Sequence, residues 1–321
     1  MNSPALPRVL VTSNQVPVAG IDLLRSKCNV TIIPAGISSR EQVLEALSDQ
    51  DAVFLASHHH VNEEFLERGK KLKVVSTMSA GYDHLDVEKI KSRGIKIGHT
   101  PVVLSAAVAE MAILLLLSAA RRAYEGRQKL ENGETATGPL WMLGQDLRGS
   151  TVGILGLGNI GQAVVKRLMG FEVGHFIYNG HSRKKAGDEL GATFVSLDQL
   201  LEQSDFLVIT VPLTNETKGL FNDSKFNKMK TTAVLVNVSR GQIIDTDALV
   251  RALENKKIFA AGLDVTDPEP LPKGHRLLEL PNVEIVPHLG SATIKTRTDM
   301  AIIAAQNIVN GLEGKPLVHS L

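Results

Sequence analysis

The sequence of 321 residues has few of the features that mark secreted or nucleic-acid-binding proteins. Its single cysteine, Cys28, rules out a disulfide within the chain and is typical of a reducing compartment. Aromatic residues make up only 4%, and 35 basic against 34 acidic residues leave a net charge of +1. The composition therefore indicates neither a base-stacking surface nor a basic patch for nucleic acid.

Long apolar segments are also lacking. The longest apolar run, from Met111 to Leu117, is far shorter than the ~20 residues needed to span a bilayer. The N-terminal segment has neither the apolar core of a signal peptide nor an arginine-rich transit pattern. We therefore expect a cytoplasmic protein that contacts no membrane.

A glycine-rich turn is the most informative stretch that is present. The apolar run from Val152 to Leu155 leads into Gly156-x-Gly158-x-x-Gly161, and a helical pattern follows directly. In such a strand-turn-helix unit the first glycine allows a sharp turn, the second lets the backbone approach a pyrophosphate, and the third lets the helix pack closely. Phosphates then accept hydrogen bonds from the free N–H groups at the helix start. The turn therefore predicts dinucleotide binding.

Strand-like and helical segments alternate along most of the chain, which is typical of parallel sheets covered by helices on both faces. A long apolar helix is predicted from Val102 to Arg122 between two such series. In the second series, six strands with the glycine turn on the first predict the doubly wound arrangement. The last predicted helix, from Thr293 to Leu312, returns to the first domain.

Two α/β domains follow from this alternation, one of them discontinuous. We expect a substrate domain formed by 1–100 and 290–321, and a dinucleotide-binding domain formed by 101–289 with an excursion at 102–144. A small ligand is expected to bind in a cleft between the domains.

Three polar clusters follow strands of the second series, at the edge where ligands of such sheets bind. They contain Arg240, then Asp264 and Glu269, and then His288. Each residue alone is an ordinary surface or turn residue. Together, beside a dinucleotide turn, they can orient, polarise and protonate a carbonyl group that receives a hydride.

The order of these motifs resembles the D-isomer-specific 2-hydroxyacid dehydrogenases over essentially the whole chain. The motifs are the glycine turn, Asn237-x-Ser239-Arg240-Gly241, Gly262-Leu263-Asp264-Val265 with Glu269-Pro270, and Pro287-His288-x-Gly290-Ser291-Ala292-Thr293. The segment Ser79 to Asp86 matches the family's substrate loop in the first domain. Three segments are most similar in sequence to the animal-type glyoxylate reductase/hydroxypyruvate reductases, namely Ser76 to Gly81, Gly262 to Thr266 and Leu289 to Thr293.

The resemblance implies two doubly wound parallel-sheet domains, a Rossmann dinucleotide-binding domain and a discontinuous flavodoxin-like substrate domain. It implies that His288 protonates the carbonyl oxygen while Glu269 hydrogen-bonds the other ring nitrogen and favours the imidazolium. Arg240 would hold the substrate carboxylate and carbonyl with its fork of donors. The implied substrate-binding residues are Ala80, Gly81, Arg240, His288 and Ser291. The implied cofactor-binding residues are Gly156, Gly158, Asn159, Ile160, Gly161, His181, Ser182, Arg183, Lys184, Pro212, Val238, Arg240, Asp264 and Gly290.

The end of the second strand favours NADPH over NADH. NAD sites place an acidic residue there, roughly 20 residues beyond the turn, to bind the ribose 2′-hydroxyl. Here Tyr178 is followed by Asn-Gly-His-Ser-Arg-Lys-Lys, which contains no carboxylate. Ser182 and Arg183 could bind a 2′-phosphate. The alternative is a solvated basic loop, and Asp188 lies in a later, helix-like segment.

We therefore expect an NADPH-dependent reductase that converts glyoxylate to glycolate and hydroxypyruvate to D-glycerate. The alternatives are a D-lactate or 3-phosphoglycerate dehydrogenase of the same family, or a non-catalytic, dinucleotide-sensing protein like the C-terminal-binding corepressors. The resemblance implies a homodimer that packs through 102–144. Trp141 in this excursion either caps its own domain or packs on a partner subunit. Thr135-Ala136-Thr137 could alter discrimination by substrate size.

The run His58-His59-His60 looks like a metal cluster. Adjacent side chains of an extended segment point to alternate faces and do not converge on one ion. We therefore expect a polar loop and no metal.

Overall fold

The structure, a computed structural model, describes residues 5–34, 39–56, 59–134, 136 and 138–321. The chain divides into two compact units. Unit 1 contains Met1–Leu104 and Ala292–Leu321, and unit 2 contains Ser105–Ser291. His58, Thr135 and Thr137 lie outside the described residues.

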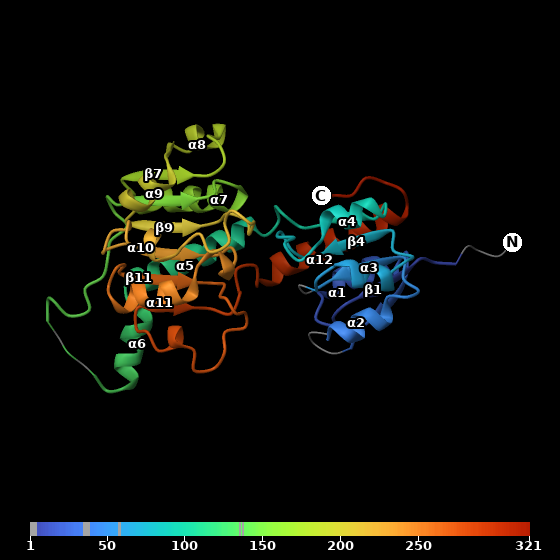
Figure 1. The fold of residues 1–321 in the computed structure, drawn as a ribbon, viewed down its shortest axis with the longest axis horizontal. Helices are drawn as coiled ribbons and strands as arrows, with labels where there is room; N and C mark the ends of the chain where they lie inside the picture. Colours follow the sequence, from blue (N-terminus) through green and yellow to red (C-terminus); the bar gives the residue numbers. More distant parts are fainter. Residues whose placement is uncertain (1–4, 35–38, 57–58, 135, 137) are drawn as a thin grey trace. The chain divides into compact units, whose positions relative to one another are not determined.

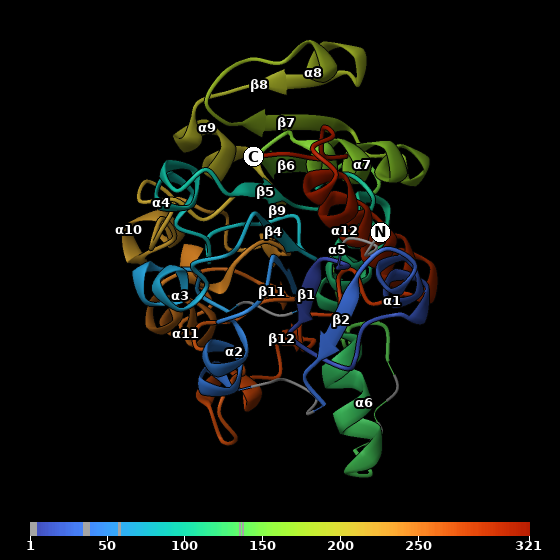
Figure 2. The same cartoon turned by 90° about the vertical axis from the view of Figure 1, so that its right-hand side faces the viewer.

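Unit 1 is built on a parallel five-stranded sheet with the order β2-β1-β3-β4-β5. This is the flavodoxin-like strand order that the resemblance implies. Helices α1 and α12 lie on one side of the sheet and α2, α3 and α4 on the other (Figure 2). The strands are β1 (Arg8–Val11), β2 (Asn29–Ile32), β3 (Ala52–Leu55), β4 (Val74–Thr77) and β5 (Lys96–Gly98). The helices are α1 (Val18–Arg25), α2 (Arg40–Ala46), α3 (Glu63–Arg68), α4 (Val87–Ser92) and α12 (Ile294–Leu312).

The central strands of unit 1 are buried on both faces because helices cover both. All four residues of β3 and of β4 are buried. Polar side chains fix where the helices begin: Ser39 and Gln42 form a reciprocal capping box at α2, and Asn62 and Asp86 cap α3 and α4.

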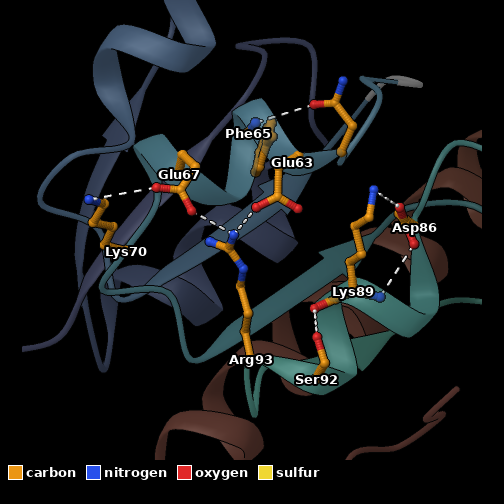
Figure 3. Close-up of polar contacts among 9 residues, drawn as sticks. Glu63, Phe65, Glu67, Lys70, Asp86, Lys89, Ser92 and Arg93 are labelled. Atoms are coloured by element: carbon orange, nitrogen blue, oxygen red, sulfur yellow. Dashed lines mark hydrogen bonds and ion pairs between the residues drawn. The ribbon is translucent and has the colours of Figure 1, made fainter.

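A surface ion-pair network joins α3 to the end of α4 (Figure 3). The guanidinium of Arg93 donates to Glu63 and, at 2.6 Å, to Glu67, which also lies 3.6 Å from Lys70. These carboxylates are about half exposed, so solvent and salt screen the network.

Unit 2 is built on a parallel seven-stranded sheet with the order β12-β11-β10-β9-β6-β7-β8. Figure 1 shows β7, β9 and β11 in this succession. The order reverses between β6 and β9, which is the switch point where doubly wound sheets bind nucleotides. The strands are β6 (Thr151–Leu155), β7 (His175–Asn179), β8 (Ala192–Phe194), β9 (Phe206–Ile209), β10 (Val234–Asn237), β11 (Ala260–Leu263) and β12 (Val283–Ile285).

Helices cover the sheet of unit 2, and short 3-10 turns join some of its elements. Among them α5 packs on α7, β10 and β11. Nine of its residues are buried, which explains its strongly apolar sequence. The helices are α5 (Ser105–Ala120), α6 (Ala123–Glu131), α7 (Asn159–Leu168), α8 (Lys185–Glu189), α9 (Leu197–Gln203), α10 (Asp223–Phe226) and α11 (Thr246–Glu254), with 3-10 turns η1 (Met169–Phe171), η2 (Gly241–Ile243) and η3 (Arg276–Leu278).

Two sequence predictions about unit 2 were wrong in detail. The sheet has seven strands rather than the six predicted. The helix predicted from Val102 to Arg122 ends at Ala120, and Arg122 adopts a left-handed φ of 55°. Its guanidinium pairs with Glu125 at 2.8 Å, and α6 begins beside it as a separate helix that the sequence analysis missed. Among the described residues, no helix is long and apolar enough to cross a membrane.

Candidate functional site

The glycine turn between β6 and α7 has the geometry of a dinucleotide-binding turn. Gly156 has a φ of +97°, which only glycine adopts readily. A Cβ on Gly161 would lie 2.3 Å from the carbonyl oxygen of Gly156, so this position also requires glycine. At Gly158, the N-cap of α7, a Cβ would meet no atom within 4 Å, so packing does not require glycine at this position. Asn159 and Ile160 form the first turn of α7, next to its free N–H groups.

The predicted phosphate-binding residues follow β7 on an exposed loop. His181, Ser182, Arg183 and Lys184 are all exposed. No carboxylate stands at the end of β7, where Asn179 instead donates to the carbonyl oxygen of Val195 at 2.8 Å.

Two contacts in this loop were not foreseen from the sequence. Buried Tyr178 accepts a hydrogen bond from the N–H of Lys184 at 2.8 Å and so fixes the loop to the sheet. Arg183, whose side chain is 70% exposed, pairs with Asp188 of α8 at 2.6 Å. Arg183 and Asp188 are five residues apart in the sequence. Their pairing could not be predicted without knowing how α8 is placed relative to the loop.

Asp264, directly after β11, organises the loop that carries the predicted catalytic histidine. Its carboxylate accepts hydrogen bonds from the N–H groups of Leu289 and Gly290 at 2.6 and 2.9 Å, and its carbonyl oxygen accepts the N–H of His288 at 2.9 Å. The side chain is only 2% exposed, and this burial raises the pKa of the Asp264 carboxyl. The charge on His288 and the two amide donors act in the opposite direction. At Gly290 a Cβ would lie 2.6 Å from this carboxylate, so a side chain there would displace Asp264.

His288 and Glu269 form a close pair. Nδ1 of His288 lies 2.6 Å from Oε1 of Glu269. Because a carboxylate only accepts hydrogen bonds, Nδ1 carries a proton, and the ring is oriented through it. His288 has a φ of 55°, an uncommon conformation for a residue with a side chain, and such residues cluster at functional sites. The pairing was implied by the resemblance, whereas the left-handed backbone was not foreseen.

Arg240 follows β10 on the neighbouring loop. Its side chain is half-buried, and Nη1 donates to the carbonyl oxygen of Ser239 at 2.8 Å. Gly241 packs so closely on the backbone of Thr266 that a Cβ would lie 2.0 Å away. The N–H of Thr266 in turn lies 3.4 Å from Oε2 of Glu269. Unit 2 thus brings the loops of Arg240, Glu269 and His288 together at one edge of its sheet.

The remaining predicted positions of unit 2 lie in segments that follow its strands. Pro212 is exposed beyond β9, Val238 is buried after β10, and Ser291 is buried at the end of the unit. In the part of the chain that the structure describes, no group of three His, Cys, Asp or Glu residues could hold a metal ion.

Ala80 and Gly81 lie on the loop after β4 in unit 1, and both are partly exposed. Three successive carbonyl oxygens of this loop accept hydrogen bonds: Ser79 from the N–H of Thr100 at 2.9 Å, Ala80 from Nδ1 of His99 at 3.2 Å, and Gly81 from the hydroxyl of Ser79 at 2.8 Å. Within the described residues, the N–H groups of Ala80 and Gly81 donate to no other group. Two adjacent backbone donors of this kind suit an anion.

Comparisons with known proteins identify the family of this chain. Residues 113–290 match the family model of the D-isomer specific 2-hydroxyacid dehydrogenase, NAD binding domain. The human glyoxylate reductase/hydroxypyruvate reductase is 49% identical over 265 residues, which cover 82% of this chain and 81% of that protein. The glyoxylate reductase of Thermococcus onnurineus is 41% identical over 94% of this chain and 92% of its own length.

Solved structures show the same fold. The TT0316 protein from Thermus thermophilus matches with a TM-score of 0.89 and 39% identity over 98% of this chain and 99% of that chain. An NADPH-dependent glyoxylate/hydroxypyruvate reductase from Sinorhizobium meliloti, solved with NADP and malonate, matches with a TM-score of 0.86 and 30% identity over 99% and 97% of the two chains.

The chain belongs to the D-isomer-specific 2-hydroxyacid dehydrogenases. It is an oxidoreductase whose unit 2 contains an NAD(P)-binding domain. The family and the fold implied by the resemblance are thereby confirmed.

Proposed function

We propose that this protein reduces small 2-oxo acids with NADPH, with glyoxylate and hydroxypyruvate as its substrates. The bound nicotinamide would supply the hydride. The observation that carries the proposal is the 2.6 Å contact between Nδ1 of His288 and Glu269. It orients the ring, and Nε2 would give a proton to the substrate carbonyl oxygen. His288 would then be the general acid, and Glu269 would stabilise its protonated form.

Arg240 and the amides of Ala80 and Gly81 would bind the substrate carboxylate. A guanidinium presents donors in a planar fork that matches a carboxylate. The two amides share their peptide groups with the carbonyls of Ser79 and Ala80. Both of these carbonyl oxygens already accept hydrogen bonds, which orients the amides. Ser291, which is buried beside Gly290, is proposed to complete the substrate-binding residues.

The proposed preference for NADPH depends on the loop after β7. Its exposed Ser182, Arg183 and Lys184 offer a hydroxyl and positive charge to a 2′-phosphate, and Asn179 provides no carboxylate for a 2′-hydroxyl. The relative from Sinorhizobium meliloti is described as NADPH-dependent and was solved with NADP. Asp264 and the residues at the strand ends, Pro212 and Val238, are proposed to contact the rest of the cofactor.

A homodimer is proposed to form through the excursion at 102–144. Large apolar side chains are exposed on its described part, namely Leu130, Leu140, Trp141 and Leu143. Trp141 lines a hollow of about 420 Å³ with Leu130 and Met142 and remains 42% exposed, so it only partly caps its own unit. Equilibrium sedimentation tests the assembly, and a monomer at micromolar concentration would contradict it.

The direct test is the oxidation of NADPH and NADH with glyoxylate, hydroxypyruvate and pyruvate as substrates. We expect NADPH turnover with the first two and poor turnover with NADH. Arg183→Ala should raise the KM for NADPH and leave that for NADH unchanged. Reduction should slow at alkaline pH because it needs a protonated general acid. Lack of turnover with all three acids would refute the proposal, and a flat pH profile from pH 6 to about 9 would refute the role of His288.

A further inference from the structure

The carbonyl of Ala80 determines which way the neighbouring amide points. In a planar trans peptide the C=O and the N–H point in opposite directions. The carbonyl oxygen of Ala80 and the N–H of Gly81 belong to one peptide group, as do the carbonyl of Ser79 and the N–H of Ala80. A donor that holds the Ala80 carbonyl therefore directs the Gly81 amide to the opposite side of the loop.

His99 is that donor. Its Nδ1 lies 3.2 Å from the carbonyl oxygen of Ala80, and because a carbonyl only accepts, Nδ1 carries the proton. The ring is half-buried, and the Tyr82 ring packs edge-on against it with 5.9 Å between centroids. Burial lowers the pKa of His99, and the neighbouring His319 lowers it further while the Ala80 hydrogen bond opposes both effects. The contact with Ala80 requires a proton on Nδ1, and a neutral ring with its one N–H at this atom supplies it.

The C-terminal segment holds His99 from the other side. The N–H of His99 donates to the carbonyl oxygen of His319 at 3.2 Å, and the N–H of Leu321 donates to Ile97 at 3.1 Å. The His99 and His319 rings lie edge to face with centroids 6.4 Å apart. Residues 318–321 thus pair with the backbone at the end of β5.

Asn307 of α12 stabilises the pairing of the C-terminal segment with the end of β5. Its side chain is fully buried, and Nδ2 donates to the carbonyl oxygen of His99 at 3.2 Å. Oδ1 accepts the N–H groups of Val318 and His319 at 2.9 and 3.1 Å. Gly98 allows this close approach, because a Cβ there would lie 2.7 Å from Asn307.

We propose that His99 is a positioning residue for substrate binding, which orients the Gly81 amide through the Ala80 carbonyl and is itself held by Asn307 and the C-terminal segment. This inference rests on the proposed function, in which that amide binds the carboxylate of a 2-oxo acid. His99 touches neither substrate nor cofactor in this role. Its loss should therefore weaken substrate binding without changing nucleotide binding.

Three substitutions test the role. His99→Asn keeps an N–H donor close to the position of Nδ1, whereas His99→Leu removes the donor and keeps an apolar group of similar bulk. We expect His99→Leu to raise the KM for hydroxypyruvate about tenfold, the effect of one lost hydrogen bond, with the KM for NADPH unchanged and kcat within about threefold. His99→Asn should stay near the wild-type KM. The exposed His175 of unit 2 supplies a control, and His175→Leu should change neither constant.

Malonate competing with hydroxypyruvate provides a second readout, because this dicarboxylate accepts no hydride. His99→Leu should raise its inhibition constant in parallel with the KM. If His99→Leu does not fold, His99→Gln replaces it. The amide of glutamine lies one bond further from the backbone, so this substitution should also raise the KM for hydroxypyruvate and the inhibition constant of malonate. An unchanged KM in a folded variant without the donor, or an equal rise for NADPH, would refute the role of His99. Lack of turnover by the wild-type protein would instead refute the proposed function.

Discussion

Alanine at Gly158 and at Gly161 should separate nucleotide binding from folding, although both glycines belong to one turn. At Gly161 the new Cβ would lie 2.3 Å from the carbonyl oxygen of Gly156, 2.9 Å from Ile154 and 3.1 Å from Thr210. Overpacking of this kind costs ~1–3 kcal/mol. Because the closest atom belongs to the backbone and cannot rotate away, we expect Gly161→Ala to lie near the upper end of this range.

Gly158→Ala should have little effect on the free energy of unfolding. Its Cβ would meet no atom within 4 Å, and the residue has a φ of −82°, which alanine adopts without strain. A change within about 0.5 kcal/mol is expected. The methyl group would instead occupy the space through which a pyrophosphate approaches the backbone. A loss of ~1.4 kcal/mol in nucleotide binding corresponds to a tenfold higher Kd, and we expect at least this loss.

Two measurements on the same samples check this pair. Thermal unfolding without nucleotide should show Gly161→Ala melting about 5–10 °C below wild type, at roughly 2–4 °C per kcal/mol. Gly158→Ala should melt at the same temperature as wild type. Titration followed by nicotinamide fluorescence should show the weakened binding of NADPH by Gly158→Ala. Equal losses of stability in the two variants, or wild-type affinity in Gly158→Ala, would refute the assignment of separate roles to these glycines.

Three further substitutions test other contacts. Glu269→Gln should lower kcat for hydroxypyruvate about tenfold or more, because an amide does not stabilise a protonated histidine, while circular dichroism stays unchanged. Asp188→Asn should lower the KM for NADPH about threefold by releasing Arg183 from its 2.6 Å ion pair, within the modest worth of exposed pairs. Glu189→Gln, which removes the same charge from the same helix, is its control, and an equal effect would refute the specific pairing. Arg93→Ala should lower the melting temperature of the protein slightly, and this difference should vanish at 1 M salt.

Local pattern was enough to predict most of the framework. Apolar runs between helical segments predicted the alternation of strands and helices, and β3, β10 and β11 are buried along their whole length, as expected for parallel strands covered on both faces. The glycine turn could also be predicted from local sequence, because the three glycines that define it lie within six residues.

Features that depend on distant contacts could not be predicted in this way. The break at Arg122 was not predicted because residues on both sides favour a helix, whereas the carbonyl oxygen of Ala120 at the helix end accepts the N–H of the distant Gln145 at 3.0 Å. The hydrogen bond from His99 to Ala80 joins residues 19 positions apart in sequence, and the contacts of Asn307 span more than 200 residues to His99. Neither leaves a periodic signal in the sequence.

Asp264 has a structural role that its sequence motif did not predict, which is to hold the backbone of His288. A left-handed backbone costs a residue such as His288 of order 1–2 kcal/mol, so the surrounding structure must hold it there. Asp264 does so with three hydrogen bonds, one through its carbonyl oxygen and two through its buried carboxylate. Because an amide side chain accepts through one atom only, Asp264→Asn would leave one of the N–H groups of Leu289 and Gly290 facing a second donor. The position of the proposed acid therefore depends on the charge of Asp264 as well as on Glu269.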